Sequence, residues 1–214
     1  MLLETSIQKA NLIMNLRSMG ISSNKVLSAI EKIPRELFVP SNFHSYAYQN
    51  NPLPIGFEQT ISQPYIVALM TEALSLQGNE VILEIGTGSG YQTSILSLLS
   101  RRVHSIERLK PLLVNAQQCF KKLKLTNIIS EVGDGFLGLP KLAPFDHVII
   151  TCAINKLDYR ILNQIRLNGV CIAPVGENEN EQRLKKITIK SNRNEDVWDD
   201  LGKVSFVPLV TDIN

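Results

Sequence analysis

Three glycines alternate with small residues directly after a short apolar run in this chain. The run at 81–85 reads VILEI, and Gly86, Gly88 and Gly90 follow it before a helix-compatible segment. Glycine adopts backbone angles that other residues avoid, and it has no Cβ to keep a ligand away from the backbone. A strand, a glycine-rich turn and a helix together predict a nucleoside-containing ligand beside a helix N-terminus.

Two acidic residues accompany these glycines. Glu84 lies within the apolar run, and Glu107 ends a second strand-like run, VHSIE, 21 positions beyond Gly86 (107 − 86). Nucleotide-binding α/β domains keep an acid at about this distance for the two ribose hydroxyls. The spacing therefore predicts cofactor contacts from both acids and favours an enzyme.

Missing motifs narrow the choice of ligand. The dinucleotide pattern G-x-G-x-x-G needs glycine where this chain has Tyr91, and the phosphate-binding G-x-x-x-x-G-K-[ST] loop is absent from the sequence. A ligand with a ribose but no phosphate fits the E-x-G-x-G-x-G turn better. S-adenosyl-L-methionine, an adenosine with a sulfonium and an amino-acid tail, is such a ligand, and we expect it as the cofactor.

Two further acids stand at strand ends. Asp134, in the sequence GDG with Gly135, follows the third strand pattern and is expected to meet an adenine edge. Asp146 opens the fourth pattern, FDHVII, where it could cap the strand without touching a ligand.

The chain alternates strand and helix patterns from residue 81 onward. Strands are expected at 80–85, 103–107, 127–132, 145–151 and 169–174, and helices at 90–100, 109–123, 136–139 and 157–166. Alternation of this kind builds a parallel sheet with helices on both faces, with ligands outside the carboxyl ends of the strands. The tail segments LKKITIKS and VWDDLGKVSFVPLV read as strands without a helix between them, which predicts an antiparallel edge.

The first 76 residues have a different pattern. Helices are expected at 5–19, from a cap at Ser22 or Ser23 to about Ile33, and at 64–76, with a loop-rich connection over 34–62. The predicted fold is a Rossmann-like α/β domain with a mostly parallel, doubly wound sheet. We expect one domain in three regions: a helical substrate-cleft region (1–76), a cofactor-binding core (77–176) and C-terminal strands (177–214).

Composition excludes several classes of protein. The 214 residues are 44% hydrophobic and 20% charged, with 22 basic and 20 acidic side chains and a net charge of +2, so a nucleic-acid partner is not expected. The three cysteines and three histidines show no metal-ligand spacing. No apolar run approaches about 18 residues, and the N-terminus lacks a signal-peptide pattern, so we expect a soluble, cytoplasmic protein that does not bind a membrane. We also expect a monomer with no bound metal ion.

Beyond these patterns, the chain resembles the protein-L-isoaspartate (D-aspartate) O-methyltransferase family from about residue 7 to residue 210. The matching segments, in the order of the family, are IPRELFVP (33–40), LPIGFEQTISQPYIVALMTE (53–72), VILEIGTGSGYQTSIL (81–96), VHSIER (103–108), VGDGFLGLP (132–140), APFDHVIIT (143–151) and KVSFVPLV (203–210). The glycine motif is common to many methyltransferases, whereas QTISQP together with FVPLV is much more specific.

The resemblance implies a reaction and a set of residues. The family moves a methyl group from S-adenosylmethionine to the α-carboxylate of L-isoaspartyl residues in damaged proteins, and the ester then collapses to a succinimide. Ser62 corresponds to the active-site serine, and Thr60 and Ile61 line the same substrate cleft. The glycine loop, Glu107, Asp134 and Gly135 correspond to cofactor contacts. Ser62 could also cap the helix that begins near Pro64.

The chain departs from the pattern of the family at three places. Phe57 and Glu58 stand where a small or polar residue and a glycine are usual, CAIN (152–155) replaces an Ala-Ala-Pro-like turn, and Asn50 replaces an aspartate. These changes leave two alternatives open. One is a different S-adenosylmethionine enzyme acting on another carboxylate or on nucleic acid, although the [DN]-P-P-[YF] turn of amino-methylating enzymes is missing. The other is a binding module without turnover.

Overall fold

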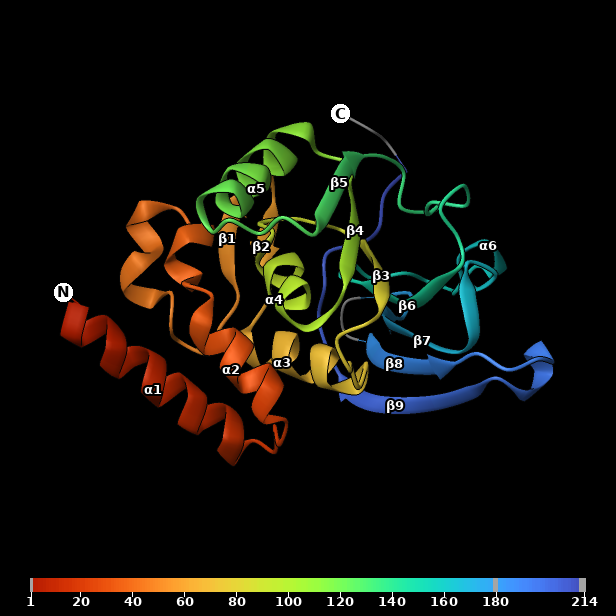
Figure 1. The fold of residues 1–214 in the computed structure, drawn as a ribbon, viewed down its shortest axis with the longest axis horizontal. Coiled ribbons are helices and arrows are strands. Elements are labelled where there is room, and N and C mark those ends of the chain that lie inside the picture. The colour runs from red at the N-terminus through yellow and green to blue at the C-terminus, as the bar shows by residue number, and fades with distance from the viewer. Residues whose placement is uncertain (1, 179–180, 212–214) are drawn as a thin grey trace.

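A computed structural model describes residues 2–178 and 181–211 of the chain. A seven-stranded sheet in the order β5-β4-β3-β6-β7-β8-β9 forms its centre (Figure 1). The strands are β3 Val81–Ile85, β4 Arg102–Glu107, β5 Ile128–Val132, β6 Phe145–Ile150, β7 Ile165–Val175, β8 Arg183–Thr188 and β9 Val197–Lys203. Strands β3 to β7 pair in parallel, and β8 and β9 continue the sheet antiparallel. The predicted mostly parallel fold with an antiparallel edge is confirmed.

The helices of the α/β part agree with the sequence patterns at two of four places. Helices α4 (Tyr91–Leu99) and α5 (Lys110–Lys122) lie where they were expected, but α6 covers only Tyr159–Leu162, and 136–139 forms turns. The 136–139 segment is held by Gln164 instead. The Gln164 side chain accepts a hydrogen bond from the Leu139 N–H and donates one to the Leu137 carbonyl, both 2.8 Å long. These bonds satisfy the backbone of the 136–139 segment without a helix.

The N-terminal region contains three helices and a hairpin. Helices α1 (Leu2–Ser18), α2 (Asn24–Lys32) and α3 (Pro64–Ala73) match the expectations, and the Ser23 hydroxyl caps α2 by accepting a bond from the Val26 N–H. The connection over 34–62 holds the 3₁₀ helices η1 (Arg35–Phe38) and η2 (Ser41–Tyr46) and the hairpin strands β1 (Leu53–Gly56) and β2 (Gln59–Ile61). The sequence did not predict this hairpin, because its turn lacks the usual Asn-Gly or Asp-Gly pair.

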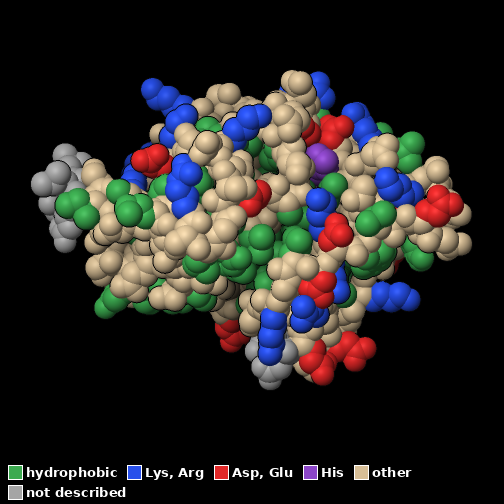
Figure 2. All heavy atoms as spheres, turned by 90° about the horizontal axis from the view of Figure 1, so that it is seen from below, with side chains coloured by type: hydrophobic (Ala, Val, Ile, Leu, Met, Phe, Trp, Pro, Cys, Tyr) green, Lys and Arg blue, Asp and Glu red, His purple; other side chains and the backbone are tan. Residues whose placement is uncertain are grey.

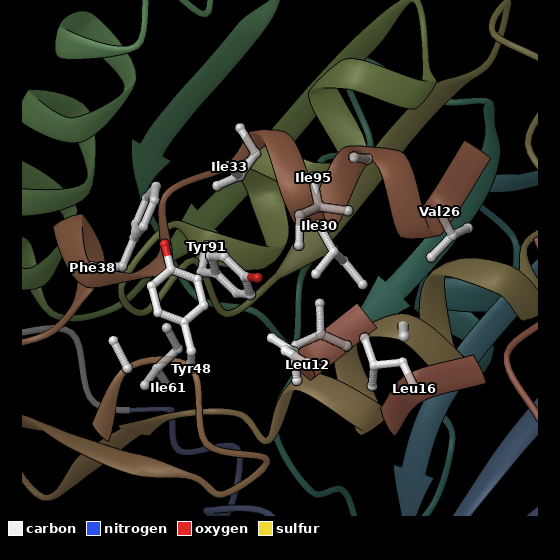
Figure 3. Packing of buried hydrophobic residues seen from close by; sticks show 14 of the residues in the cluster. Leu12, Leu16, Val26, Ile30, Ile33, Phe38, Tyr48, Ile61, Tyr91 and Ile95 are labelled. Carbon is white, nitrogen blue, oxygen red and sulfur yellow. The ribbon is translucent and has the colours of Figure 1, made fainter. Parts of the chain in front are cut away.

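One hydrophobic cluster joins the N-terminal region to the α/β core. Figure 3 shows Tyr91 and Ile95 of α4 beside Ile30 of α2 and Leu12 and Leu16 of α1, all of them buried. Burying a side chain of this size stabilises the fold by roughly 1.5–3 kcal/mol. The helical region is therefore packed directly against the helix that follows the glycine loop.

The C-terminal tail returns to the sheet beside β6. Strand β9 ends at Lys203, so the second tail segment is a strand only in its first half. The Ala153 N–H then donates to the Val207 carbonyl at 2.8 Å, and the Leu209 N–H donates to the Ala153 carbonyl at 2.7 Å. These bonds bring the FVPLV segment to the edge where the parallel strands end.

The described part of the chain shows no sign of a membrane span or a metal site. Basic and acidic side chains are intermingled on the face shown in Figure 2. None of the helices in residues 2–178 and 181–211 has the length and apolarity that a bilayer-spanning helix needs. Within the same residues, no three His, Cys, Asp or Glu side chains are grouped so that they could hold a metal ion.

Candidate active site

A cavity opens at the carboxyl ends of the central strands, where β3 pairs with β4 on one side and β6 on the other. This is the switch point at which doubly wound sheets bind ligands. The cavity is open to solvent, and its lining mixes bare backbone with polar and apolar side chains, as is usual for ligand sites. Its walls come from the β2 segment, the glycine loop, the ends of β4 and β6, and the C-terminal tail.

Two residues of the glycine loop, Gly86 and Gly88, line the cavity with bare backbone, and Thr87 and Ser89 line it between and after them. Gly86 has a φ of +95°, and a Cβ there would overlap the Thr151 hydroxyl, which donates to the Gly86 carbonyl at 2.5 Å. Gly90, with a φ of +85°, is the N-cap of α4, and a Cβ there would lie 2.6 Å from the ring of Phe120. Larger residues are thus excluded on steric grounds at both ends of the loop.

Glu107 lies at the floor of the cavity and is only 6% exposed. One of its carboxylate oxygens accepts a hydrogen bond of 2.7 Å from the Gly88 N–H, and the other accepts one of 3.0 Å from the Leu109 N–H. Each oxygen keeps a further lone pair. A pair of vicinal hydroxyls from a ribose fits this arrangement.

Glu84 does not line the cavity. Its buried carboxyl accepts bonds from the hydroxyls of Thr93 (2.5 Å) and Ser105 (2.6 Å), and Ser105 also bonds the Thr87 hydroxyl in the glycine loop (2.6 Å). Burial raises the pKa of Glu84 to about 8, although the two hydroxyl bonds act in the opposite direction. The carboxyl is therefore mostly protonated at neutral pH and lies behind the loop.

The two aspartates at strand ends make local contacts. The Asp134 carboxylate accepts a bond of 2.9 Å from the Phe136 N–H, and the neighbouring glycines, Gly133 and Gly135, line the cavity. Asp146 accepts a bond of 2.7 Å from the Val81 N–H and pairs with Arg166 at 2.6 Å. Asp146 thus caps β3 from the neighbouring strand.

The segment Thr60, Ile61 and Ser62, to which the resemblance assigns the substrate cleft, lines the same cavity as the glycine loop. The alternative role of Ser62 as a helix cap is wrong: the N-cap of α3 is Gln63, and its side chain makes no capping bond. Ser62 and Thr60 also line an adjoining cavity together with Lys203, Phe206 and Val207 of the tail. The two cavities share Thr60 and Ser62, and also Thr151 and Val207.

Several cavity residues were not among the predicted site residues. Tyr91 and Gln92 of α4, Thr151 and Cys152 after β6, and the tail residues 207–210 all line the cavity. The only signal for the tail was the FVPLV segment. Nothing in the spacing of the chain predicts that a turn after β6 pairs with it.

The residues present fit S-adenosylmethionine. Gly86 and Gly88 give a ligand access to the backbone, and the Glu107 carboxylate suits ribose hydroxyls. A Cβ at Gly135 would lie 2.5 Å from Ile85, so this part of the wall is also bare backbone. The described lining contains no phosphate-binding loop.

Comparison with known proteins gives one consistent result. The family model described as protein-L-isoaspartate(D-aspartate) O-methyltransferase (PCMT) matches residues 7–214. A protein-L-isoaspartate O-methyltransferase of Dictyoglomus turgidum is 48% identical over 202 residues, which cover 94% of this chain and 90% of that protein.

Solved structures agree. A protein-L-isoaspartate O-methyltransferase structure matches with a TM-score of 0.86 at 25% identity, over 96% of this chain and 67% of that one. A Plasmodium falciparum structure with the same family name, in complex with S-adenosyl-L-homocysteine, matches with a TM-score of 0.80 at 24% identity, over 94% of this chain and 97% of that one. With the glycine loop, Glu107 and the serine segment around one cavity, these matches show that the chain belongs to the protein-L-isoaspartate(D-aspartate) O-methyltransferase family.

Proposed function

We propose that this chain methylates the α-carboxylate of L-isoaspartyl residues, and of D-aspartyl residues as a second substrate, in damaged proteins. The observation that carries the proposal is the single cavity in which the serine segment faces the glycine loop and Glu107. The methyl ester that forms closes spontaneously to a succinimide, which partly reopens as normal aspartate, so the outcome is repair.

Cofactor binding is assigned to the backbone wall and its acids. Gly86, Gly88 and Gly90 would approach the cofactor closely, Glu107 would accept hydrogen bonds from the ribose, and Gly135 with Asp134 would border the adenine. Glu84 acts indirectly, because it supports the loop from behind through Ser105 and Thr87. When bound, S-adenosyl-L-methionine supplies a methyl group on a sulfonium, which a substrate carboxylate oxygen can accept without loss of a proton.

The side chains of the cavity suit a substrate that needs no general base. A backbone-type carboxylate has a pKa of about 3.5 and is therefore already ionised at neutral pH. Ser62 would donate its hydroxyl proton to one carboxylate oxygen and orient the other, with Thr60 and Ile61 beside it. Apolar side chains such as Ile61 and Leu209 exclude water, which would otherwise stabilise the separated charges.

The adjoining cavity would take the residues that flank the isoaspartate. It shares Thr60, Ser62, Thr151 and Val207 with the cofactor cavity, so a polypeptide could continue from one into the other. A protein substrate needs such a path because its chain must leave the serine in two directions.

One assay tests the function. Labelled S-adenosylmethionine is offered with two peptides that differ only in an isoaspartyl or a normal aspartyl linkage, and the transferred methyl is counted. We expect label on the isoaspartyl peptide alone. Equal labelling would indicate a broader carboxyl methyltransferase, and cofactor binding without any labelling would indicate a binding module.

We further propose that the chain is one domain with the regions 1–76, 77–176 and 177–214, and that it works as a cytoplasmic monomer without a nucleic-acid partner. Support for a single domain comes from the cluster that joins α1 and α2 to α4. The net charge of +2 and the intermingled charges of Figure 2 favour a protein substrate over nucleic acid. Sedimentation velocity would test the monomer.

A further inference from the structure

Arg35 is a buried cation beside the serine segment. The side chain is 0% exposed, and its Nη2 donates to the backbone carbonyls of Ser62 (2.9 Å) and Asn51 (3.4 Å). Its Nε and Nη1 have no hydrogen-bond partner, and none of the ion pairs among the described residues involves Arg35. Burying a charge without an opposite charge is costly, so a residue of this kind calls for an explanation.

The same guanidinium lies over an aromatic ring. Its Cζ is 4.9 Å from the centre of the Tyr91 ring, a favourable position for a cation. Tyr91 is the first residue of α4, directly after Gly90, and lines the cofactor cavity together with Ser62. Figure 3 shows Tyr91 close to Tyr48 and Ile61, and Phe38 packs edge-on against it at 5.5 Å.

Arg35 therefore contacts two parts of the cavity wall without lining the cavity itself. One part is the serine segment, held through the Ser62 carbonyl, and the other is the start of α4, held through the Tyr91 ring. A planar guanidinium can donate in one plane and stack on a ring with its face, which an ammonium cannot do. A neutral side chain of similar length would fill the space at a lower desolvation cost but would leave the Ser62 carbonyl without its donor.

We propose that Arg35 is a positioning residue for methyl transfer: it fixes the Ser62 backbone relative to the glycine loop and so places the serine hydroxyl for the substrate carboxylate. This inference rests on the proposed function. It separates placement of the substrate from binding of the cofactor, because Gly86, Gly88 and Glu107 are held by bonds that do not involve Arg35.

The test compares Arg35→Lys and Arg35→Met with the wild type in single-turnover methyl transfer at saturating cofactor and isoaspartyl peptide. Misplacement of a reacting group by about 1 Å can cost on the order of 100-fold in rate. We expect a fall of about 100-fold for Arg35→Met and about tenfold for Arg35→Lys. The dissociation constant of S-adenosylhomocysteine, measured by calorimetry, should stay within about threefold of the wild-type value at unchanged stoichiometry.

A double-mutant cycle shows whether Arg35 acts through Ser62. In a Ser62→Ala background the hydroxyl is gone, so adding Arg35→Lys should lower the methyl-transfer rate by less than about threefold relative to Ser62→Ala alone. Arg193→Met is the matched control. Arg193 also donates to a backbone carbonyl, that of Leu162 at 3.1 Å, and its Nη1 makes no hydrogen bond. Unlike Arg35 it has an ion-pair partner, Asp196 at 3.8 Å, and it lines neither cavity. It should lower the melting temperature and leave the rate unchanged.

Three results would overturn the inference. An unchanged rate in Arg35→Lys and Arg35→Met is one, and equal losses from Arg35→Lys with and without the Ser62 hydroxyl is another. The third is a loss of S-adenosylhomocysteine binding in proportion to the loss of rate, which would indicate a purely structural role. If Arg35→Met fails to fold, the rate and the S-adenosylhomocysteine affinity of Arg35→Lys decide between these outcomes. A wild-type chain without turnover overturns the proposed function as well, whereas an active wild type with any of the three results overturns this inference alone.

Discussion

The carboxylate of Glu107 accepts a hydrogen bond of 2.7 Å from the backbone N–H of Gly88. This bond ties the end of β4 to the middle of the glycine loop, so the acid and the bare backbone form one rigid unit. The carboxylate lines the cavity beside Gly86 and Gly88 and keeps lone pairs that a ligand can use. The arrangement accounts for the spacing of 21 residues between Gly86 and Glu107 in the sequence.

Glu107→Gln should weaken cofactor binding. The amide oxygen can still accept the Gly88 bond, but the amide nitrogen then faces the Leu109 N–H and cannot accept from it. Hydrogen bonds to a neutral oxygen are also weaker than those to a carboxylate by about 1 kcal/mol. We expect the dissociation constant of S-adenosylhomocysteine to rise roughly five- to tenfold by calorimetry. Glu131→Gln, at an exposed acid of β5 outside the cavity, is the control. An unchanged affinity in Glu107→Gln would argue against a ribose contact.

Ser62→Ala should affect the opposite wall of the cavity. Removal of the hydroxyl takes away the donor that orients the substrate carboxylate, so turnover should fall on the order of 100-fold. Cofactor affinity should remain nearly that of the wild type, because the glycine loop and Glu107 are untouched. The measurement is a rate at saturating cofactor together with calorimetric titration of S-adenosylhomocysteine. Parallel loss of both quantities would show that Ser62 serves cofactor binding instead.

The sequence predicted the sheet and the glycine loop well because both depend on local patterns. Apolar runs separated by helical periodicity leave little choice but a parallel sheet, and the loop position follows from the first strand. The directions of individual side chains were harder to predict from the sequence. Glu84 was expected at the ligand, yet its carboxyl points to the side of the sheet that α4 covers, where Thr93 binds it. Successive residues of a strand point to opposite faces of the sheet. The position of Glu84 two residues before Gly86 therefore did not show which way its carboxyl points.

The parts that the sequence did not predict depend on contacts between distant segments. Arg35 meets the carbonyl of Ser62 across 27 positions, and Ala153 pairs with the tail at Val207. The hairpin that carries the serine segment has Phe57 and Glu58 at its turn, both with positive φ. Such residues avoid this conformation, so no local signal indicated a turn.

Glu58→Gly should stabilise the protein and alter substrate affinity. Glu58 has a φ of +56°, a conformation that costs a residue other than glycine about 1–2 kcal/mol, of which the greater unfolded-state freedom of glycine offsets roughly half. We expect a gain of about 0.5–1 kcal/mol in the free energy of unfolding, measured with urea. The Michaelis constant for an isoaspartyl peptide should fall about two- to threefold at low salt, because an exposed negative charge beside the cavity is removed.

Lys124→Gly separates these two effects. Lys124 also has a φ of +56° but lies after α5, and it lines neither cavity. It should give a similar gain in stability with no change in the Michaelis constant. If both variants shifted the constant equally, the effect of Glu58 would not be electrostatic.

Glu84→Gln should remove a pH dependence of stability. Burial raises the pKa of Glu84 from its ordinary value of 4.5 to about 8, so between these values the folded state keeps a proton that the unfolded chain releases. The free energy of unfolding should therefore fall as pH rises from about 4.5 to 8, by at most about 1.4 kcal/mol per pH unit from this group, and level off outside that window. Glutamine remains neutral and lacks this slope.

The measurement is urea unfolding of the wild type, Glu84→Gln and Glu131→Gln from pH 5 to pH 8.5. The difference between wild type and Glu84→Gln isolates the buried carboxyl, and it should grow with pH in favour of the variant. Glu131→Gln should keep the wild-type slope, because its carboxyl is exposed. Parallel curves for the wild type and Glu84→Gln would mean that Glu84 is ionised in the folded protein at neutral pH, and its bonds to Thr93 and Ser105 would then stabilise a buried anion behind the glycine loop.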